Sequence, residues 1–215
     1  MIDIPNKGEV LSFQVPEDIL MSMYKVYHSV ELPTELLYDN NSVIKCLSKE
    51  GGFTNDVDYK SISDWVGNPI HEFRLERISP SPQMKHSYLW NSRIPNLDFD
   101  KNNHLSKLDS QSKGWPSLFW HADTYQPESR CKAIIYLNDV DVDNGAVCME
   151  ESLTYINDDS YSEVQGLYDH VNDIPSKFYE GKAGTCVLFR ARQLHRINFP
   201  NHHHRDAVHI GFDCE

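Results

Sequence analysis

The sequence predicts a mainly β protein with helices at its N-terminal end, and three observations support this. Apolar residues recur at helix spacing in the first third of the chain. From about residue 71 the pattern changes to short apolar runs between turn residues, as in a sandwich or jelly roll. A chain of 215 residues that is 40% hydrophobic can bury one full core. We therefore expect a single domain over 1–215, with a helical support region at 1–70 and a jelly-roll core at 71–215.

Three helices are expected in the N-terminal third. The first follows Pro16, where two acidic residues make a favourable first turn. The second is expected from about Ser42 to Glu50, before a pair of glycines. The third is expected from about Ser61 to Val66, and Gly67 should end it.

Six apolar segments then predict strands. They are HEFRLERI, KHSYLWNSR, CKAIIYLND, GAVCMEE, GTCVLFR and DAVHIGFD. Two long polar connections, 95–116 and 158–182, interrupt the series. Because both exceed the length of ordinary loops, we expect them to be lids or disordered segments.

Composition narrows the classes of function. The N-terminus lacks a basic and apolar leader, and no run approaches 18 apolar residues, so we expect a soluble cytoplasmic protein without membrane contact. A net charge of −12 repels polyanions, so no nucleic-acid partner is expected. Five cysteines without a CxxC pair argue against a disulfide framework and a thiolate zinc site. We expect reduced, partly buried thiols.

Three residues suggest a metal site. His121 and Asp123 precede the segment CKAIIYLND, and His195 follows GTCVLFR. Two imidazoles and one carboxylate leave open positions for a bidentate cosubstrate and O₂, as in non-haem iron oxygenases. With 11 His, about one H-x-D triplet is expected by chance, so the triplet alone is only a hypothesis. A second triplet begins at His204, but no strand pair fits between it and a later histidine.

The surrounding segments strengthen the hypothesis. The segments are WHAD, YLND with DNGAV, and GTCVLFRARQLHRINFPNHHHRDAVHIGF. Through them the chain resembles the iron(II)- and 2-oxoglutarate-dependent oxygenase superfamily, and its motifs are most similar to those of the phytanoyl-CoA dioxygenase-like branch. The resemblance covers about residues 115–213 and implies a double-stranded β-helix, or cupin-like jelly roll. It implies Fe(II), 2-oxoglutarate and O₂, with His121, Asp123 and His195 as metal ligands. It makes Arg205 the partner of the cosubstrate's distal carboxylate, which a guanidinium can bind with two hydrogen bonds.

Strand alternation adds further candidates. In DAVHIGFD the apolar residues Val208, Ile210 and Phe212 should face the core, so Arg205 and His209 should face the opposite, cavity side. His209, and Tyr88 and Asn91 in KHSYLWNSR, are candidates for the cosubstrate pocket, with ordinary structural roles as the alternative. The run 202–204 of three histidines is interpreted as solvated.

The resemblance implies a dioxygenase that converts 2-oxoglutarate to succinate and CO₂ while it hydroxylates a small molecule or an amino-acid side chain. Related nucleic-acid demethylases usually carry a second arginine where this chain has Gly211, and prolyl hydroxylases usually carry lysine in place of Arg205. Two alternatives remain open: a non-catalytic jelly-roll protein, and a cupin-like protein that binds zinc or manganese. The sequence fixes neither the substrate nor the oligomeric state.

Overall fold

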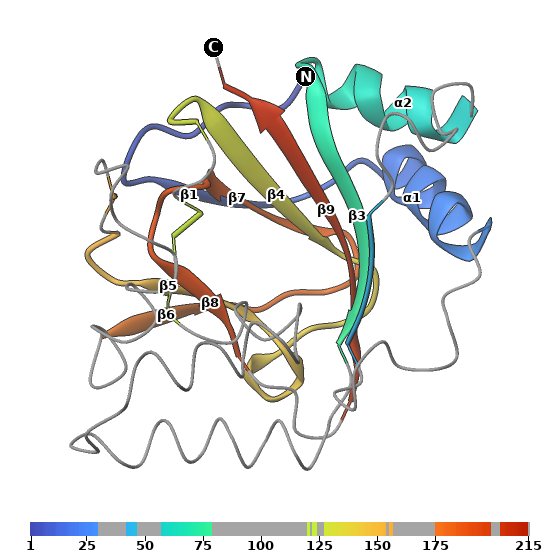
Figure 1. Cartoon of the computed structure of the whole chain (residues 1–215). Coiled ribbons are helices and arrows are strands. Elements are labelled where there is room, and N and C mark those ends of the chain that lie inside the picture. Colours follow the sequence, from blue (N-terminus) through green and yellow to red (C-terminus); the bar gives the residue numbers. More distant parts are fainter. Residues whose placement is uncertain are drawn as a thin grey trace, which may run out of the picture.

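The computed structural model describes residues 1–29, 42–46, 57–78, 120, 122–123, 127–153, 155–156, 175–198 and 203–214. Over these residues the chain is mainly β, with two α-helices beside the larger of two antiparallel sheets (Figure 1). The elements in chain order are β1 (Val10–Gln14), α1 (Glu17–Ser29), β2 (Ser42–Cys46), α2 (Val57–Val66), β3 (Ile70–Ile78), β4 (Arg130–Tyr136), the short 3-10 helix η4 (Val142–Asn144), β5 (Val147–Glu150), β6 (Ser176–Tyr179), β7 (Thr185–Arg190), β8 (His195–Ile197) and β9 (Arg205–Asp213).

The described strands form a main sheet of six strands in the order β1-β7-β4-β9-β3-β2 and a smaller sheet in the order β6-β5-β8. All neighbouring strands are antiparallel. In Figure 1 the helices lie at one side of the main sheet, and β5, β6 and β8 form a separate layer. We call the face of the main sheet toward the smaller sheet the inner face.

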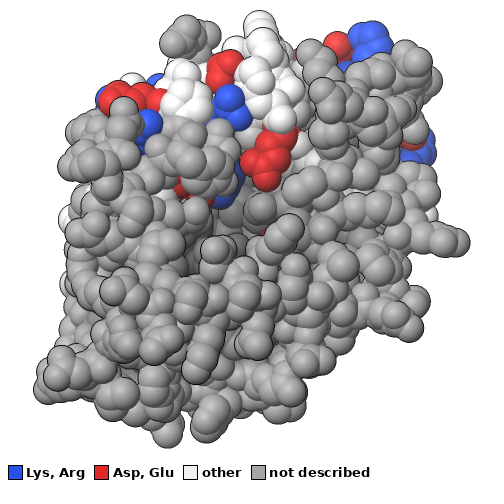
Figure 2. Space-filling model, in the orientation of Figure 1, with Lys and Arg blue, Asp and Glu red and all other residues white. Residues whose placement is uncertain are grey.

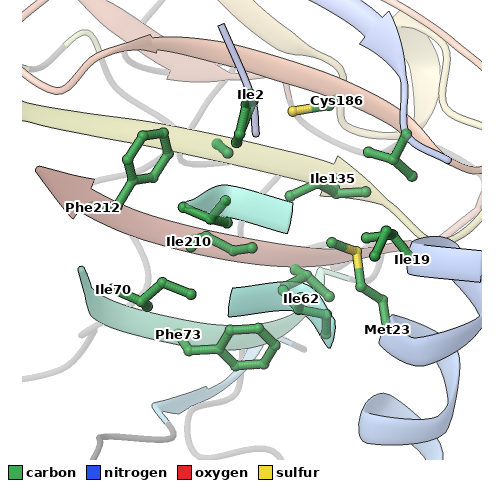
Figure 3. Packing of buried hydrophobic residues seen from close by; sticks show 14 of the residues in the cluster. Ile2, Ile19, Met23, Ile62, Ile70, Phe73, Ile135, Cys186, Ile210 and Phe212 are labelled. Carbon is green, nitrogen blue, oxygen red and sulfur yellow. The ribbon is translucent and has the colours of Figure 1, made fainter. Parts of the chain in front are cut away.

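The larger core lies on the helix side of the main sheet (Figure 3). Alternate residues of the central strands point into it, among them Leu75, Ile135, Leu188 and Ile210, all fully buried. Met23 of α1 joins them from the helical layer. Since each such side chain contributes about 1.5–3 kcal/mol when buried, this core fixes which residues must face the opposite side.

The intervening residues face the smaller sheet. Ile134 and Val187 of the main sheet pack there against Val147 and Met149 of β5. Because strand side chains alternate between faces, Lys132 on β4 and Arg205 on β9 share this inner face. The candidate site lies between the two sheets.

One hydroxyl ties the sheets together. Tyr136 Oη donates to the carbonyl oxygen of Tyr179 at 2.6 Å and accepts from the backbone nitrogen of Val147 at 3.0 Å. Tyr136 belongs to β4, whereas its partners belong to β6 and β5. Burial raises the pKa of Tyr136 to about 12, so the phenol stays neutral and donates across the layer.

The helix predictions are partly confirmed. α1 follows Pro16, and α2 ends before Gly67, which has the positive φ of 75° that favours glycine, although α2 begins earlier than expected. The helix predicted from Ser42 is wrong over 42–46, which form strand β2 paired with β3. The β-branched pair Val43 and Ile44 suits a strand, and an edge of β3 was available for pairing. Residues 47–50 lie outside the described residues.

Five of the six predicted strand segments are confirmed, as β3, β4, β5, β7 and β9. The sixth, KHSYLWNSR, lies outside the described residues, as does the connection 95–116. The expected connection 158–182 is wrong in its last part, since 176–179 form β6 beside β5. β1 and β8 were not predicted either, because β8 has only three residues and β1 is a short edge strand.

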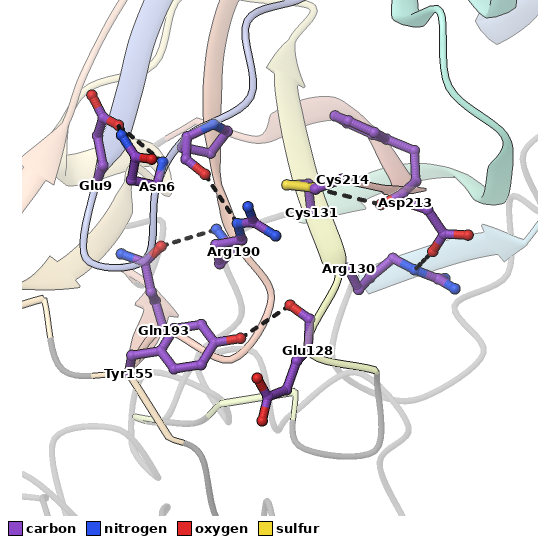
Figure 4. Close-up of a disulfide and its surroundings, with 12 residues drawn as sticks. Asn6, Glu9, Glu128, Arg130, Cys131, Tyr155, Arg190, Gln193, Asp213 and Cys214 are labelled. Carbon is purple, nitrogen blue, oxygen red and sulfur yellow. Dashed lines mark hydrogen bonds and ion pairs between the residues drawn. A yellow bond between two sulfur atoms is a disulfide. The ribbon is translucent and has the colours of Figure 1, made fainter.

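The expectation that all cysteines are reduced is wrong for two of them. Cys131 and Cys214 form a disulfide, with Cα atoms 5.9 Å apart (Figure 4). Cys131 is the cross-strand partner of Phe212, two residues before Cys214. This register brings together cysteines that are 83 residues apart in sequence. Cys148 and Cys186 are free and buried, and burial raises the pKa of both thiols.

The described helices and one face of the surface show how hydrophobic and charged residues are distributed. Neither described helix has the length and hydrophobicity needed to span a membrane. Figure 2 shows acidic and basic side chains close together among the described residues of one face. On that face the described residues therefore do not gather into a patch of one sign.

Candidate functional site

Asp123 is buried next to the turn between β7 and β8. Its backbone nitrogen donates to the carbonyl oxygen of Ala191 at 3.0 Å, and its side chain is only 2% exposed. Oδ2 of Asp123 forms an ion pair with Nζ of Lys132, another buried residue. This pair lies on the inner face, near the first residues of β4. His121, the other half of the predicted H-x-D motif, lies outside the described residues.

Trp120, just before the motif, anchors this segment. It is buried and packs with Cys148 and Leu194. The guanidinium of Arg196 lies over its ring, 5.2 Å from the centroid, within the range of a cation–π interaction. These contacts fix the position of Trp120 directly before the motif.

His195 is buried at the start of β8, with 2% of its surface exposed. Its Nδ1 lies 2.7 Å from the carbonyl oxygen of Gln193. A carbonyl can only accept, so Nδ1 carries a proton, and in the neutral form of the ring Nε2 then holds the lone pair. Metal-binding histidines commonly have this support from a second hydrogen bond. The ring also packs on Phe189, with centroids 4.7 Å apart.

Asp123 and His195 each contact one member of the same pair of neighbouring residues on the inner face of the main sheet. Lys132, which contacts Asp123, is the register partner of Phe189, which contacts His195. Among the described residues no three His, Cys, Asp or Glu side chains form a group that could hold a metal. The predicted triad needs His121 and stays a prediction.

Arg205 is fully buried at the start of β9. Its Nη1 donates to the carbonyl oxygen of Gly145 at 3.0 Å, and its Nη2 forms an ion pair with Glu76. Nε of Arg205 is buried and has no hydrogen-bond partner within the described part of the chain. A buried donor without a partner costs about 1–3 kcal/mol, so the guanidinium has capacity for a further acceptor.

Gly145 holds the guanidinium in place and must be glycine. Its φ of 105° lies in the left-handed region, where a Cβ is strained. A Cβ at this position would also lie 3.3 Å from Cβ and 3.4 Å from Cδ of Arg205. The Asn144-Gly145 turn, visible in the sequence as DNGAV, therefore lets the backbone approach Arg205 closely enough to accept its hydrogen bond.

Glu76 completes a buried cluster that sequence reasoning missed. Its Oε1 contacts Nη2 of Arg205 and lies 3.0 Å from Nε2 of His209. Glu76 is the register partner of Ala207, midway between Arg205 and His209 on β9. A signal was present in HEFRLERI, where Leu75 faces the core and the charged Glu76 beside it must therefore face inward.

The structure describes some of the remaining predicted residues and not others. Val208, Ile210 and Phe212 are in the core on the helix side, and His209 is buried on the other face, as strand alternation predicted. His203 and His204 are exposed, which agrees with their interpretation as solvated residues. Tyr88, Asn91 and His202 lie outside the described residues.

No protein-family model matches the chain, and no curated protein matches it. Solved structures do match over most of its length. The "non-heme alpha ketoglutarate dependent epimerase SnoN from nogalamycin biosynthesis" has a TM-score of 0.55 at 10% identity, covering 96% of this chain and 79% of that chain. The corresponding carbocyclase SnoK has a TM-score of 0.55 at 12% identity, covering 96% and 80%.

A third match is HygX from Streptomyces hygroscopicus, solved with nickel, 2-oxoglutarate and hygromycin B bound. Its TM-score is 0.51 at 12% identity, covering 96% of this chain and 83% of that chain. At such identities the likeness concerns the fold and not the substrate. This chain shares the fold of SnoN and SnoK, which are described as non-haem and alpha-ketoglutarate (2-oxoglutarate) dependent, and of HygX, which was solved with 2-oxoglutarate bound.

Proposed function

We propose that this protein is an iron(II)- and 2-oxoglutarate-dependent dioxygenase, a single double-stranded β-helix (jelly-roll) domain over 1–215. One observation carries the proposal. Arg205 is fully buried on the inner face of the main sheet, and its Nε has no partner within the described residues. A buried guanidinium with remaining hydrogen-bond capacity suits a carboxylate ligand. The shared fold and the motif resemblance support 2-oxoglutarate as that ligand.

His121, Asp123 and His195 would hold the metal. Mixed imidazole and carboxylate groups suit Fe(II), and the proton on Nδ1 of His195 leaves the Nε2 lone pair of the neutral ring to coordinate a metal. Bound Fe(II), with 2-oxoglutarate and O₂, supplies the oxidising chemistry that forms succinate and CO₂ and hydroxylates the substrate. The chain's own contribution is to orient the ligands and exclude water, since Asp123 and His195 are each only 2% exposed.

The charges of the buried groups favour joint binding of metal and cosubstrate. Lys132 and Arg205 are cationic, and Asp123 and Glu76 are anionic, so these four charges cancel. A divalent cation together with a dicarboxylate keeps that balance. Either ligand alone leaves a buried net charge, which is costly in a site of low dielectric.

We infer a small-molecule substrate, with an amino-acid side chain as the alternative within the same chemistry. SnoN has been solved with nogalamycin RO and HygX with hygromycin B, both small molecules. SnoN and SnoK are described as an epimerase and a carbocyclase, so product analysis must separate hydroxylation from other oxidative outcomes. The phytanoyl-CoA dioxygenase-like branch rests on the sequence motifs alone.

A cupin-like protein that binds zinc or manganese without 2-oxoglutarate is the second candidate, and one observation favours it. The guanidinium of Arg205 already has a buried carboxylate partner in Glu76. Because the carboxylate of Glu76 already neutralises the charge of Arg205, an external dicarboxylate gains less from binding there.

Anaerobic titration distinguishes the two candidates. The apo-protein is titrated with Fe(II) and then with 2-oxoglutarate, while the visible absorption spectrum is recorded. We expect the weak charge-transfer band of the Fe(II)–2-oxoglutarate chelate, which a parallel titration with Zn(II) should lack. Metal binding without this band, and without measurable 2-oxoglutarate affinity, would favour the cupin-like candidate.

A further inference from the structure

We propose that Glu76 is a built-in competitor of the cosubstrate: its carboxylate holds Arg205 while the pocket is empty, and 2-oxoglutarate must displace it. The inference rests on the proposed role of Arg205 as the partner of the distal carboxylate. Glu76 is then the residue that sets how strongly this pocket selects a dicarboxylate over a monocarboxylate.

The contacts place Glu76 where a ligand carboxylate would bind. Nη1 of Arg205 is used by the carbonyl oxygen of Gly145, and Nη2 is used by Glu76. A carboxylate that binds a guanidinium with two hydrogen bonds needs a pair of adjacent nitrogens. Because Nη1 already donates to the carbonyl oxygen of Gly145, the pair that remains for a ligand is Nη2 and Nε. Glu76 already contacts Nη2.

His209 gives the displaced carboxylate a second partner. Oε1 of Glu76 lies 3.0 Å from Nε2 of His209 as well as contacting Arg205. All three side chains are buried, with Glu76 and Arg205 fully so. Release of a buried carboxylate from Arg205 is unfavourable unless other groups stabilise its charge. The contact with His209 makes the exchange feasible without moving Glu76 into water.

Competition of this kind lowers apparent affinity in a calculable way. The apparent affinity for 2-oxoglutarate is the intrinsic affinity multiplied by the fraction of molecules in which Arg205 is released. If Glu76 holds Arg205 in about nine molecules of ten, removing its charge tightens binding about tenfold. A ligand without the distal carboxylate does not need Arg205, so its affinity should not respond.

Calorimetry on the Mn(II)-loaded protein tests this with two ligands. 2-Oxoglutarate is compared with 2-oxopentanoate, which has the same 2-oxo acid group and chain length but ends in a methyl group. Wild type is compared with Glu76→Gln, and with Glu72→Gln as a matched control on the same strand and face. Thermal melting by circular dichroism confirms that each variant is folded.

We expect Glu76→Gln to bind 2-oxoglutarate about tenfold more tightly, with 2-oxopentanoate unchanged within about twofold and Glu72→Gln like wild type. Equal or weaker 2-oxoglutarate binding by folded Glu76→Gln would overturn the inference, because Glu76 would then support Arg205 instead of competing. If Glu76→Gln does not fold, Glu76→Asp, whose carboxylate is set back by one methylene, is judged by the same criteria. If wild type and both Glu76 variants bind neither ligand, the proposed function itself fails.

Discussion

Tyr136→Phe tests how the two sheets are held together around the proposed site. The change removes one hydroxyl and keeps the ring. It takes a partner from the carbonyl oxygen of Tyr179 and from the backbone nitrogen of Val147, both in the smaller sheet. Each buried polar group left without a partner costs about 1–3 kcal/mol, so for two groups we expect a loss of about 2–6 kcal/mol in the free energy of unfolding. That is a large part of the stability of a typical domain.

Urea or guanidinium unfolding at pH 7, followed by circular dichroism, measures the loss. Tyr59→Phe is the control, because it removes a hydroxyl from α2, on the opposite side of the main sheet. A cost below about 1 kcal/mol for Tyr136→Phe would refute the reasoning, since the bridging hydroxyl would then contribute no more than an average hydrogen bond.

The same hydroxyl predicts a dependence of stability on alkaline pH. Burial raises the pKa of Tyr136 from 10.0 to about 12, so the folded state favours the neutral phenol. Its contribution is fully present below pH 10 and is lost as pH rises from about 10 to about 12. Two pKa units correspond to about 3 kcal/mol, and Tyr136→Phe should lose stability less steeply over this interval. Equal slopes for wild type and variant would contradict the assignment.

Two further substitutions probe the proposed site. His195→Ala should lose bound Fe(II), measured by metal analysis after desalting, while its melting temperature stays near that of wild type, because a metal ligand is removed from a site with two others. The exposed His203→Ala should keep its iron, and retention of iron by both variants would remove His195 from the ligand set. Gly145→Ala places a side chain in the left-handed region, at about 1–2 kcal/mol, and against Arg205, so 2-oxoglutarate affinity should fall while metal affinity stays. Unchanged 2-oxoglutarate affinity in that variant would show that Gly145 does not position Arg205.

Short sequence patterns predicted those features of the fold and site that depend on neighbouring residues, such as the alternation of side chains along a strand. The alternation along β9 correctly separated Val208, Ile210 and Phe212 from His209 and Arg205, because side chains in a strand must alternate between faces. The DNGAV segment, which carries part of the family resemblance, contains Gly145, whose positive φ is a conformation that glycine adopts without strain.

Contacts distant in sequence were the part that could not be predicted. Residues 42–46 are a strand because β3 offers them an edge, and five residues alone do not reveal that partner. The Cys131–Cys214 disulfide and the Glu76–Arg205 pair both depend on the register of β9 against its neighbours. Register is fixed by the whole sheet, so the alternation in HEFRLERI can place Glu76 on the inner face but cannot identify Arg205 as its partner.

The central claim is that Arg205 binds the distal carboxylate of 2-oxoglutarate. Removing Arg205 alone would deprive the buried carboxylate of Glu76 of its arginine partner, so the better test combines Arg205→Met with Glu76→Gln and compares it with Glu76→Gln alone.

Calorimetry on the Mn(II)-loaded proteins is the most direct measurement. We predict that the double variant keeps its Mn(II) affinity and binds 2-oxoglutarate at least about tenfold more weakly than Glu76→Gln, on the order of 2–5 kcal/mol for a lost buried charge pair. Arg205→Lys should retain only part of the wild-type affinity, since one ammonium cannot make the two-pronged contact. Equal 2-oxoglutarate affinity in Glu76→Gln and the double variant would contradict the claim and favour the cupin-like metal-binding protein.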